Sequence, residues 1–300
     1  MTDITKVGVV GAGLMGHGIA QVSAEAGYDV VLLDADQGAL DRGLAAVGAL
    51  LDRAVAKEKT TAEAADGVRA RIQGTTDAQD LASCDMVIEA IIEQLEPKLD
   101  LWRTLDPIVQ PSAVFASNTS SLSIIEQAAV TERPDRVIGL HFFNPVQVMG
   151  LVEVVRTIAA SDDAVAAGTD YVTRIGKLPV ETRDRAGFLV NRILVPFMLD
   201  AVRAFEEGVG TIEAIDAGFR LGAGHPMGPL TLNDFVGLET LARAGEGMYE
   251  EYRDPRFATP PLLRKMIAAG WYGKKTGMGF YDWSGGAPVP NPKIDLLRTV

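Results

Sequence analysis

"KVGVVGAGLMGHGIA", residues 6–20, joins an apolar run to a glycine-rich turn and then to a helical pattern. After a strand, the first glycine of such a loop permits a tight turn, and the second lets a phosphate approach the backbone. The third lets the helix pack closely, so that the N-terminus of the helix faces the phosphates. The stretch therefore predicts a dinucleotide site at the start of a doubly wound domain, formed by Gly11, Gly13, Leu14, Met15 and Gly16.

An acidic residue closes the next predicted strand, "DVVLLD", at Asp34. A carboxylate at this point accepts hydrogen bonds from the adenosine ribose and repels a 2′-phosphate, so the pattern favours NAD over NADP. The alternative is a turn with an incidental aspartate, which the strand–turn–helix context disfavours.

The first half of the chain alternates apolar strand signals with helical patterns, including a long charged helical excursion at 37–72. Such alternation indicates a parallel sheet covered on both faces. After about residue 185 the strand signal disappears, and helices are expected at 187–207, 211–221 and 230–250. We predict an α/β, Rossmann-type, mainly parallel sheet domain over 1–184 and an all-helical domain over 185–300.

Composition limits the classes of partner. The formal charge of −12 argues against nucleic acid or an anionic membrane surface as the main partner. The most apolar late stretch, residues 187–205, carries Asn191, Arg192, Asp200 and Arg203, so no membrane span is expected. The start of the chain shows no secretory signal pattern, and the single cysteine, Cys84, permits no internal disulfide. These features favour a cytoplasmic protein.

Polar side chains follow three successive strands of the predicted sheet. Glu93 follows "DMVIEAI", the run Asn118–Ser121 follows "AVFAS", and His141 ends "RVIGLH". Ligands of doubly wound sheets lie beyond the carboxyl ends of the strands, so these groups are expected to face one crevice. The alternative for His141 is a structural histidine. For the other two histidines, His17 and His225, a structural role is the favoured interpretation.

Glu153 lies in the apolar run "LVEVV". Alternation along a strand places it on one face with Leu151 and Val155, where a carboxylate is costly to bury alone. We predict that the chain turns back through residues 145–150 and pairs Glu153 with His141. The alternative is a surface strand whose glutamate faces water.

Asn191 lies on a predicted apolar helix face with Phe188, Val195, Met198 and Val202. An amide there needs a partner. That partner is either a carbonyl of the core or a ligand between the two domains, and position alone decides neither.

The whole chain resembles the 3-hydroxyacyl-CoA dehydrogenase family, and its short bacterial 3-hydroxybutyryl-CoA dehydrogenases above all. The resemblance rests on "GVVGAGLMGHGIA", "IEAIIEQLEPK", "SNTSSLSI", "GLHFFNPVQVMGLVEVV", "DRAGFLVNRILVPF", "HPMGPLTLNDFVGL" and "GKKTGMGFYDW". It implies NAD as cofactor, an acyl-CoA substrate and a homodimer formed mainly through the helical domain.

The resemblance also assigns roles to individual residues. It implies that His141 is the catalytic base with Glu153 as its partner, and that Ser120 and Asn191 contact the substrate oxygen or its surroundings. Asn144 would line the site, and Glu93 and Lys98 would lie near the nicotinamide end of the cofactor.

One segment departs from the lysine-rich pattern expected for contact with the CoA phosphates. Residues 53–67 read "RAVAKEKTTAEAADG", in which Glu58 separates Lys57 from Lys59. The two lysines either bind CoA or form a solvated helix end.

We therefore expect an NAD-dependent oxidoreductase that interconverts (S)-3-hydroxyacyl-CoA, in particular 3-hydroxybutyryl-CoA, and 3-oxoacyl-CoA. One alternative is a relative that oxidises a free hydroxy acid of the sugar-acid or carnitine type. Another is a non-catalytic NAD-binding protein, although such a role would need neither His141 nor Glu153.

Overall fold

The computed structural model describes residues 4–285 and 287–294. The chain forms two compact units, Met1–Phe188 and Leu189–Val300. The domain boundary predicted after residue 184 remains a prediction. The ends of the two predicted domains, residues 1–3 and 295–300, lie outside the described residues.

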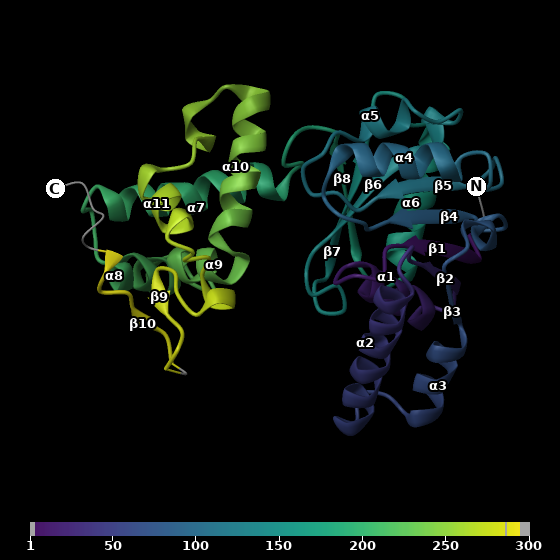
Figure 1. The fold of residues 1–300 in the computed structure, drawn as a ribbon, viewed down its shortest axis with the longest axis horizontal. Coiled ribbons are helices and arrows are strands. Elements are labelled where there is room, and N and C mark those ends of the chain that lie inside the picture. Colours follow the sequence, from purple (N-terminus) through teal and green to yellow (C-terminus); the bar gives the residue numbers. More distant parts are fainter. Residues whose placement is uncertain (1–3, 286, 295–300) are drawn as a thin grey trace. The chain divides into compact units, whose positions relative to one another are not determined.

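The first unit contains an eight-stranded sheet with strand order β3-β2-β1-β4-β5-β6-β7-β8 (Figure 1). The strands are β1 (Lys6–Val10), β2 (Asp29–Leu33), β3 (Ile72–Thr75), β4 (Met86–Glu89), β5 (Val114–Ser117), β6 (Val137–Phe142), β7 (Leu151–Arg156) and β8 (Leu178–Arg183). All neighbours are parallel except β6 and β7, which are antiparallel. The predicted doubly wound, mainly parallel sheet is confirmed.

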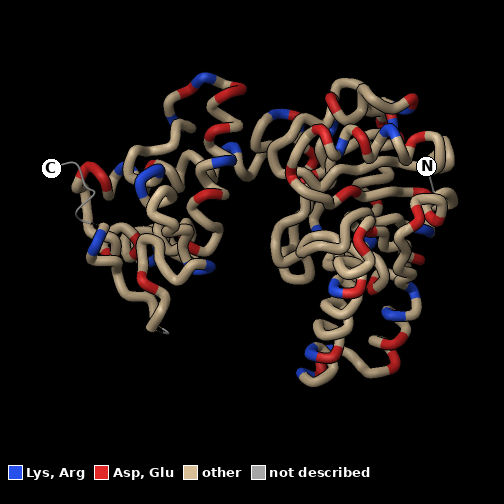
Figure 2. Tube along the Cα trace, viewed as in Figure 1, with Lys and Arg blue, Asp and Glu red and all other residues tan. Residues whose placement is uncertain are grey.

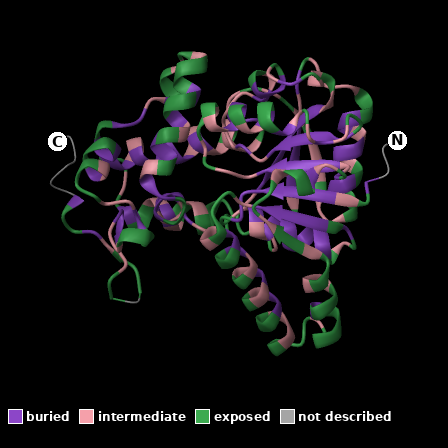
Figure 3. Ribbon diagram, turned by 45° about the vertical axis from the view of Figure 1, so that its right-hand side comes forward, coloured by how far each residue is buried: buried purple, intermediate pink, exposed green. Residues whose placement is uncertain are grey.

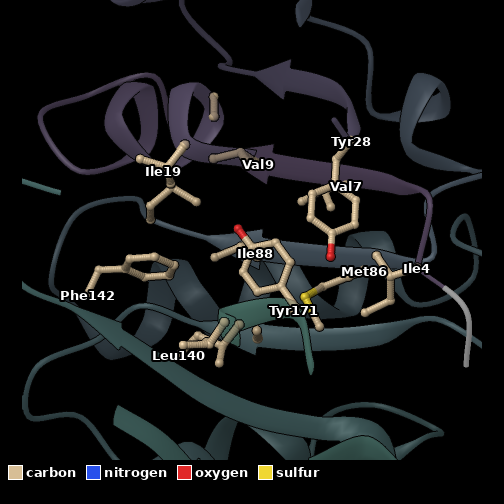
Figure 4. Close-up of a cluster of buried hydrophobic side chains, with 14 of the residues drawn as sticks. Ile4, Val7, Val9, Ile19, Tyr28, Met86, Ile88, Leu140, Phe142 and Tyr171 are labelled. Carbon is tan, nitrogen blue, oxygen red and sulfur yellow. The ribbon is translucent and has the colours of Figure 1, made fainter. Parts of the chain in front are cut away.

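Helices cover both faces of this sheet, whose central strands are largely buried, whereas the edge strands β3 and β8 are partly exposed (Figure 3). One face packs against α1 (Gly16–Glu25) and α6 (Asp162–Arg174), and the other packs against α4 (Leu95–Leu105) and α5 (Ile124–Ala128). Figure 4 shows the first of these cores, in which Ile19 of α1 and Tyr171 of α6 approach side chains of β1 and β4. Alternate residues of a strand point to opposite sides of the sheet, so the nearly continuous apolar runs of these strands make both faces apolar.

The charged excursion is a pair of helices, α2 (Gln37–Ala56) and α3 (Ala62–Ala70), which share a small core of Val47, Leu51 and Ala65. Basic and acidic residues alternate toward the far end of this arm (Figure 2). At the end of α2, Glu58 has a left-handed backbone with φ of 55°. The amide of Lys59 then bonds the carbonyl of Ala54, and the amide of Glu58 bonds that of Val55. This is a Schellman ending with glutamate where glycine is usual.

The second unit is mainly helical, as predicted. Its helices are α7 (Val190–Glu206), α8 (Ile212–Ala217), α9 (Pro229–Val236), α10 (Leu238–Tyr252) and α11 (Pro261–Ala268). The prediction of a single helix at 230–250 is wrong, because Gly237, with φ of 98°, separates α9 from α10. A two-stranded ladder of β9 (Tyr281–Asp282) and β10 (Val289–Pro290) also departs from the all-helical prediction. In the described part of the chain, no helix has the length and apolarity that crossing a membrane requires.

The helix expected from residue 187 begins later. Gly187 and Phe188 both have positive φ, 81° and 45°, so neither can start a right-handed helix. Phe188 is buried in the core of the sheet unit rather than on the apolar face of α7, which corrects the stripe proposed above. Val195, Met198 and Val202 are buried on α7 as expected.

Two buried carboxylates organise the second unit. Asp216 accepts bonds from the amide of Leu230, from Thr231 and from the hydroxyl of Tyr281. Asp234 accepts bonds from the amides of Phe280 and Tyr281 and from the indole of Trp283. Both carboxylates thereby hold the β9 segment against α8 and α9.

Candidate active site

The glycine loop between β1 and α1 has the geometry that a pyrophosphate needs. A Cβ on Gly16 would lie 1.7 Å from the carbonyl oxygen of Gly11, so only glycine lets α1 start this close to the strand. A Cβ on Gly13 would meet nothing within 4 Å, so that side of the loop is open. The first turn of α1 carries neither a side-chain cap nor an acidic residue. Its partial positive charge is therefore available to an anion.

Asp34 braces this loop from the end of β2. One carboxylate oxygen accepts the amide of Ala12 at 2.8 Å, and the other accepts the amide of Asp36 at 3.0 Å. Asp36 in turn caps α2 by accepting the amide of Ala39. Two carboxylates thus lie within one turn where the ribose is expected. Within the loop, Leu14 is exposed and Met15 packs on the core.

A buried charge cluster occupies the end of β4. Nζ of Lys98, on α4, lies 2.5 Å from Oε1 of Glu89 and 3.3 Å from Oε2 of Glu93. The Lys98 and Glu89 side chains are 1% and 0% exposed, whereas that of Glu93 is 29% exposed. Ser117, at the end of β5, donates its hydroxyl to the other oxygen of Glu89 at 2.6 Å. Lys98 is therefore enclosed between two carboxylates, and Glu93 is the exposed end of the cluster.

Glu93 connects this cluster to Ser120. Its Oε1 accepts the Thr119 hydroxyl at 2.6 Å, the Ser120 amide at 2.8 Å and the Ser120 hydroxyl at 3.2 Å. Burial opposes ionisation, but the Lys98 charge and these hydrogen bonds outweigh it and lower the pKa of Glu93. An ionised Glu93 accepts only, so the Ser120 hydroxyl must be the donor, and its lone pairs remain for a ligand.

His141 and Glu153 meet as predicted. They are direct partners across the antiparallel β6 and β7, and Nδ1 of His141 lies 2.5 Å from Oε2 of Glu153. Both side chains are buried, at 7% and 0% exposure. The alternative of a glutamate facing water is excluded. Because a carboxylate can only accept, Nδ1 carries the proton, and Nε2 of the neutral ring is a base.

The surroundings of His141 fix its position. Phe143 and Phe188 contact the imidazole, with ring centroids at 4.5 and 5.6 Å. Asn118, beyond β5, accepts the amide of Phe142 at 2.9 Å. This bond ties the Ser120 loop to the end of the strand that carries His141. The structure thus brings Glu93, Ser120 and His141 to one edge of the sheet, as the sequence indicated.

Other predicted residues lie elsewhere. Asn144 is exposed in the loop between β6 and β7, and Lys57 and Lys59 are exposed at the end of the helical arm. Asn191 is half-buried on α7, in the second unit. Nδ1 of His17 lies 2.7 Å from the carbonyl oxygen of Gly13, and His225 packs against the rings of Phe197 and Phe219 in tilted and edge-on arrangements.

Sequence reasoning missed Glu89 and Ser117. Glu89 lies in the apolar run "DMVIEAII", the same signal that singled out Glu153. It was detectable as a carboxylate that must find a buried partner. Lys98 on the buried face of α4 is that partner, and its burial was not foreseen.

Comparison with known proteins agrees with this geometry. The NAD-binding domain of 3-hydroxyacyl-CoA dehydrogenase matches residues 6–185, and the C-terminal domain of that enzyme matches residues 187–283. The chain belongs to the 3-hydroxyacyl-CoA dehydrogenase family. It is an NAD-dependent member, because the matched N-terminal domain is the one that binds NAD, and the glycine loop described above fits that cofactor.

Individual members of the 3-hydroxyacyl-CoA dehydrogenase family resemble the chain over nearly its full length. A 3-hydroxybutyryl-CoA dehydrogenase of Bradyrhizobium diazoefficiens is 46% identical, covering 96% of this chain and 98% of its own. The human mitochondrial hydroxyacyl-coenzyme A dehydrogenase is 42% identical, covering 93% and 91%. The crystal structure of (S)-3-hydroxybutyryl-CoA dehydrogenase from Ralstonia eutropha superposes with a TM-score of 0.92 at 45% identity, covering 94% and 100%.

Proposed function

We propose that this enzyme interconverts (S)-3-hydroxybutyryl-CoA and acetoacetyl-CoA with NAD(H). The observation that carries the proposal is the buried His141–Glu153 pair at the sheet edge that also holds the glycine loop. The substrate follows from relatives named for 3-hydroxybutyryl-CoA at 46% identity.

In the oxidation direction, Nε2 of His141 removes the hydroxyl proton of the substrate. The bound nicotinamide supplies the hydride chemistry, and the protein supplies position and proton handling. Glu153 holds the Nδ1–H tautomer and stabilises the imidazolium that forms. In the reduction direction, the same imidazolium returns its proton to the oxygen of the ketone.

Substrate contacts are assigned to five further residues. Ser120 presents hydroxyl lone pairs beside the base, and Asn144 lines the loop that follows β6. Asn191 contacts the substrate oxygen or its surroundings from α7. Lys57 and Lys59 contact the CoA phosphates, which is supported by their exposure at the end of the helical arm. Gly11, Gly13, Leu14, Met15, Gly16 and Asp34 contact NAD, and Glu93 and Lys98 form the nicotinamide end of its site.

NADH oxidation with acetoacetyl-CoA, measured beside free acetoacetate, tests the substrate. We expect kcat/KM for the thioester to exceed that for the free acid by at least about 10²-fold, because the carrier supplies binding energy away from the reacting carbon. Equal values would remove the CoA assignment. An absence of turnover with either compound would favour a non-catalytic NAD-binding protein.

The Asn191→Ala variant tests the assignment on α7. Asn191 is half-buried. If its amide contacts the substrate and not the core, as we propose, turnover should fall about tenfold or more while the melting temperature changes little. Asn233→Ala is the contrasting variant, because Asn233 is buried and its amide donates to the carbonyl of Met198. A large loss of stability in Asn191→Ala, with activity per folded molecule intact, would make Asn191 a core amide.

We further propose a homodimer in the cytoplasm, formed mainly through the second unit. An apolar cavity of about 440 Å³ opens there between α7 and α8, with lining residues that include Phe197, Ala201, Ala204 and Phe219. Val209 beside it is 75% exposed, an apolar surface that a second copy would cover. The Val209→Asp variant should shift the mass measured by sedimentation toward that of a monomer, and a wild-type monomer would refute the dimer.

A further inference from the structure

The cluster of Glu89, Lys98 and Glu93 contains one more carboxylate than ammonium. Lys98 is bonded to both glutamates, and Glu89 also accepts the amide of Ile91 at 2.8 Å and the hydroxyl of Ser117. A buried ion pair costs desolvation and is weak evidence for stability by itself. The arrangement therefore calls for a role other than holding the fold together.

Its place on the sheet indicates that role. Glu89 is the register partner of Val10, the residue before the glycine loop, and a Cβ on Gly11 would lie 2.6 Å from the carbonyl oxygen of Ala90. On the other side, Glu93 bonds Ser120, and the Ser120 loop is tied through Asn118 to the strand of His141. The cluster thus lies between the phosphate-binding loop and the base. A dinucleotide that spans these two points places its nicotinamide against Glu93.

The redox state of the cofactor changes the charge at this position. The oxidised nicotinamide ring carries one positive charge and the reduced ring carries none. A nearby group with net negative charge therefore stabilises the oxidised form and leaves the reduced form almost unaffected. The exposed part of Glu93, ionised and fixed by Lys98, is the part of the cluster that the ring would meet.

We propose that the excess negative charge of the Glu89–Lys98–Glu93 cluster sets the relative affinity of the enzyme for NAD⁺ and NADH, with Glu89 acting through Lys98. This inference rests on the proposed placement of the nicotinamide beside Glu93 and does not depend on the acyl substrate. Glu89 is a positioning and charge-setting residue, because it is fully buried and its two carboxylate oxygens bond Lys98, the amide of Ile91 and the hydroxyl of Ser117.

The Glu89→Gln variant removes one charge and keeps the shape. Its amide oxygen can face Lys98 and Ile91 while its amide nitrogen donates to Ser117. The ratio Kd(NAD⁺)/Kd(NADH), measured by NADH fluorescence titration and by competition with NAD⁺, should rise about three- to tenfold, the size expected for one charge at several ångströms in a partly shielded site. The Glu89→Gln/Lys98→Met double variant restores the net charge of the cluster and should return the ratio to the wild-type value.

Glu132→Gln is the matched control. Glu132 is exposed and precedes β6, at the amino ends of the strands and not at their carboxyl ends. Replacing it by Gln changes the net charge of the protein by the same amount as Glu89→Gln does. An unchanged ratio in folded Glu89→Gln, or an equal rise in Glu132→Gln, would overturn the proposal. If Glu89→Gln yields no folded protein, Glu93→Gln removes the same charge from a partly exposed position, and an unchanged ratio there has the same force. Because no measurement uses acyl-CoA, failure of the proposed substrate would appear separately, as wild-type enzyme that binds NADH but leaves acetoacetyl-CoA unreduced.

Discussion

His141 and Glu153 are opposite one another on two antiparallel strands, and the carboxylate oxygen lies 2.5 Å from the ring nitrogen that faces away from the expected substrate. The carboxylate is wholly buried, so we expect it to act on the reaction through the imidazole and not by touching the substrate.

Glu153→Gln should therefore leave NADH binding within about twofold of wild type and lower kcat by about 10²-fold or more, the range typical of general acid–base catalysis. His141→Ala should be at least as damaging, and the double variant should be little worse than the worse single one, because the two residues act as a unit. Steady-state kinetics with fluorescence titration of NADH measure both effects. Losses that multiply in the double variant would show that the residues act independently.

Asp34→Ala should narrow the preference for NADH over NADPH, but incompletely, because the exposed Asp36 carboxylate lies in the same turn. It should also weaken NADH binding, since Ala12 loses the acceptor that braces the glycine loop. The Asp34→Ala/Asp36→Ala double variant should bring the kcat/KM values for NADH and NADPH still closer together. It should also free Arg42, which lies 3.8 Å from Asp36, to contact the 2′-phosphate of NADPH. Comparable kcat/KM values for the two cofactors in the wild type would contradict the role of both carboxylates.

The charge of Glu58 should oppose binding of CoA. Glu58→Gln is expected to lower KM for acetoacetyl-CoA and Lys57→Ala to raise it, each by up to about fivefold, because exposed charge pairs are weak. Both effects should shrink at high salt, and the KM for NADH should not change. Identical KM values for acetoacetyl-CoA in all three proteins would show that the end of the arm is only a solvated helix terminus.

The backbone of the same residue gives an independent prediction. A left-handed conformation costs a non-glycine residue roughly 1–2 kcal/mol, so Glu58→Gly should raise the free energy of unfolding of the sheet unit by about 1 kcal/mol. Glu58→Gln keeps the strain and should not stabilise the protein. Urea denaturation of the two variants separates backbone from charge, and equal stability of both would show that the conformation stores no strain.

Asp234 should make the second unit sensitive to pH. Burial raises the pKa of its carboxyl to about 6, although the hydrogen bonds donated by Trp283, Tyr281 and Phe280 act in the opposite direction and lower it. This folded value exceeds that of an unfolded aspartate, about 3.9, so the contribution of Asp234 to stability is full below about pH 4 and is lost as the pH rises through 6.

Asp234→Asn removes that dependence. Between pH 5 and 7.5 the free energy of unfolding of the wild type should fall by about 1 kcal/mol more than that of the variant, beyond any constant offset. Urea denaturation at both pH values, followed by tryptophan fluorescence, measures the difference. Parallel pH profiles would show that Asp234 stays ionised throughout this range.

The elements that follow from local pattern were predictable. Alternation fixes the face on which Glu153 lies, and an apolar strand must pair a buried carboxylate, so the contact with His141 could be expected from sequence. The glycine loop was predictable for a similar reason, because Gly11 and Gly16 each answer a steric need that no other residue meets, and Gly13 keeps the loop open for a phosphate.

The remaining features depend on tertiary contacts. Lys98 occupies a buried position of α4 because two glutamates from the β4 end surround it, and no pattern within the helix reveals that. The break at Gly237 was hidden by helix-compatible neighbours on both sides. Phe188 fits the helical period of the sequence, but the left-handed backbone of Gly187 and of Phe188 itself directs its side chain into the sheet unit.

The reversal of β7 makes strand alignment part of the chemistry. A change in the length of the loop from Phe143 to Gly150 that moved the pairing by a single residue would present Val152 or Val154 to the imidazole, because neighbouring side chains point to opposite faces. The strand would still be apolar and could still close the sheet, yet the base would have lost its carboxylate. If the pair acts as proposed, we expect homologous chains to accept insertions at this turn only where these bulge out of the ladder and leave a carboxylate opposite the histidine.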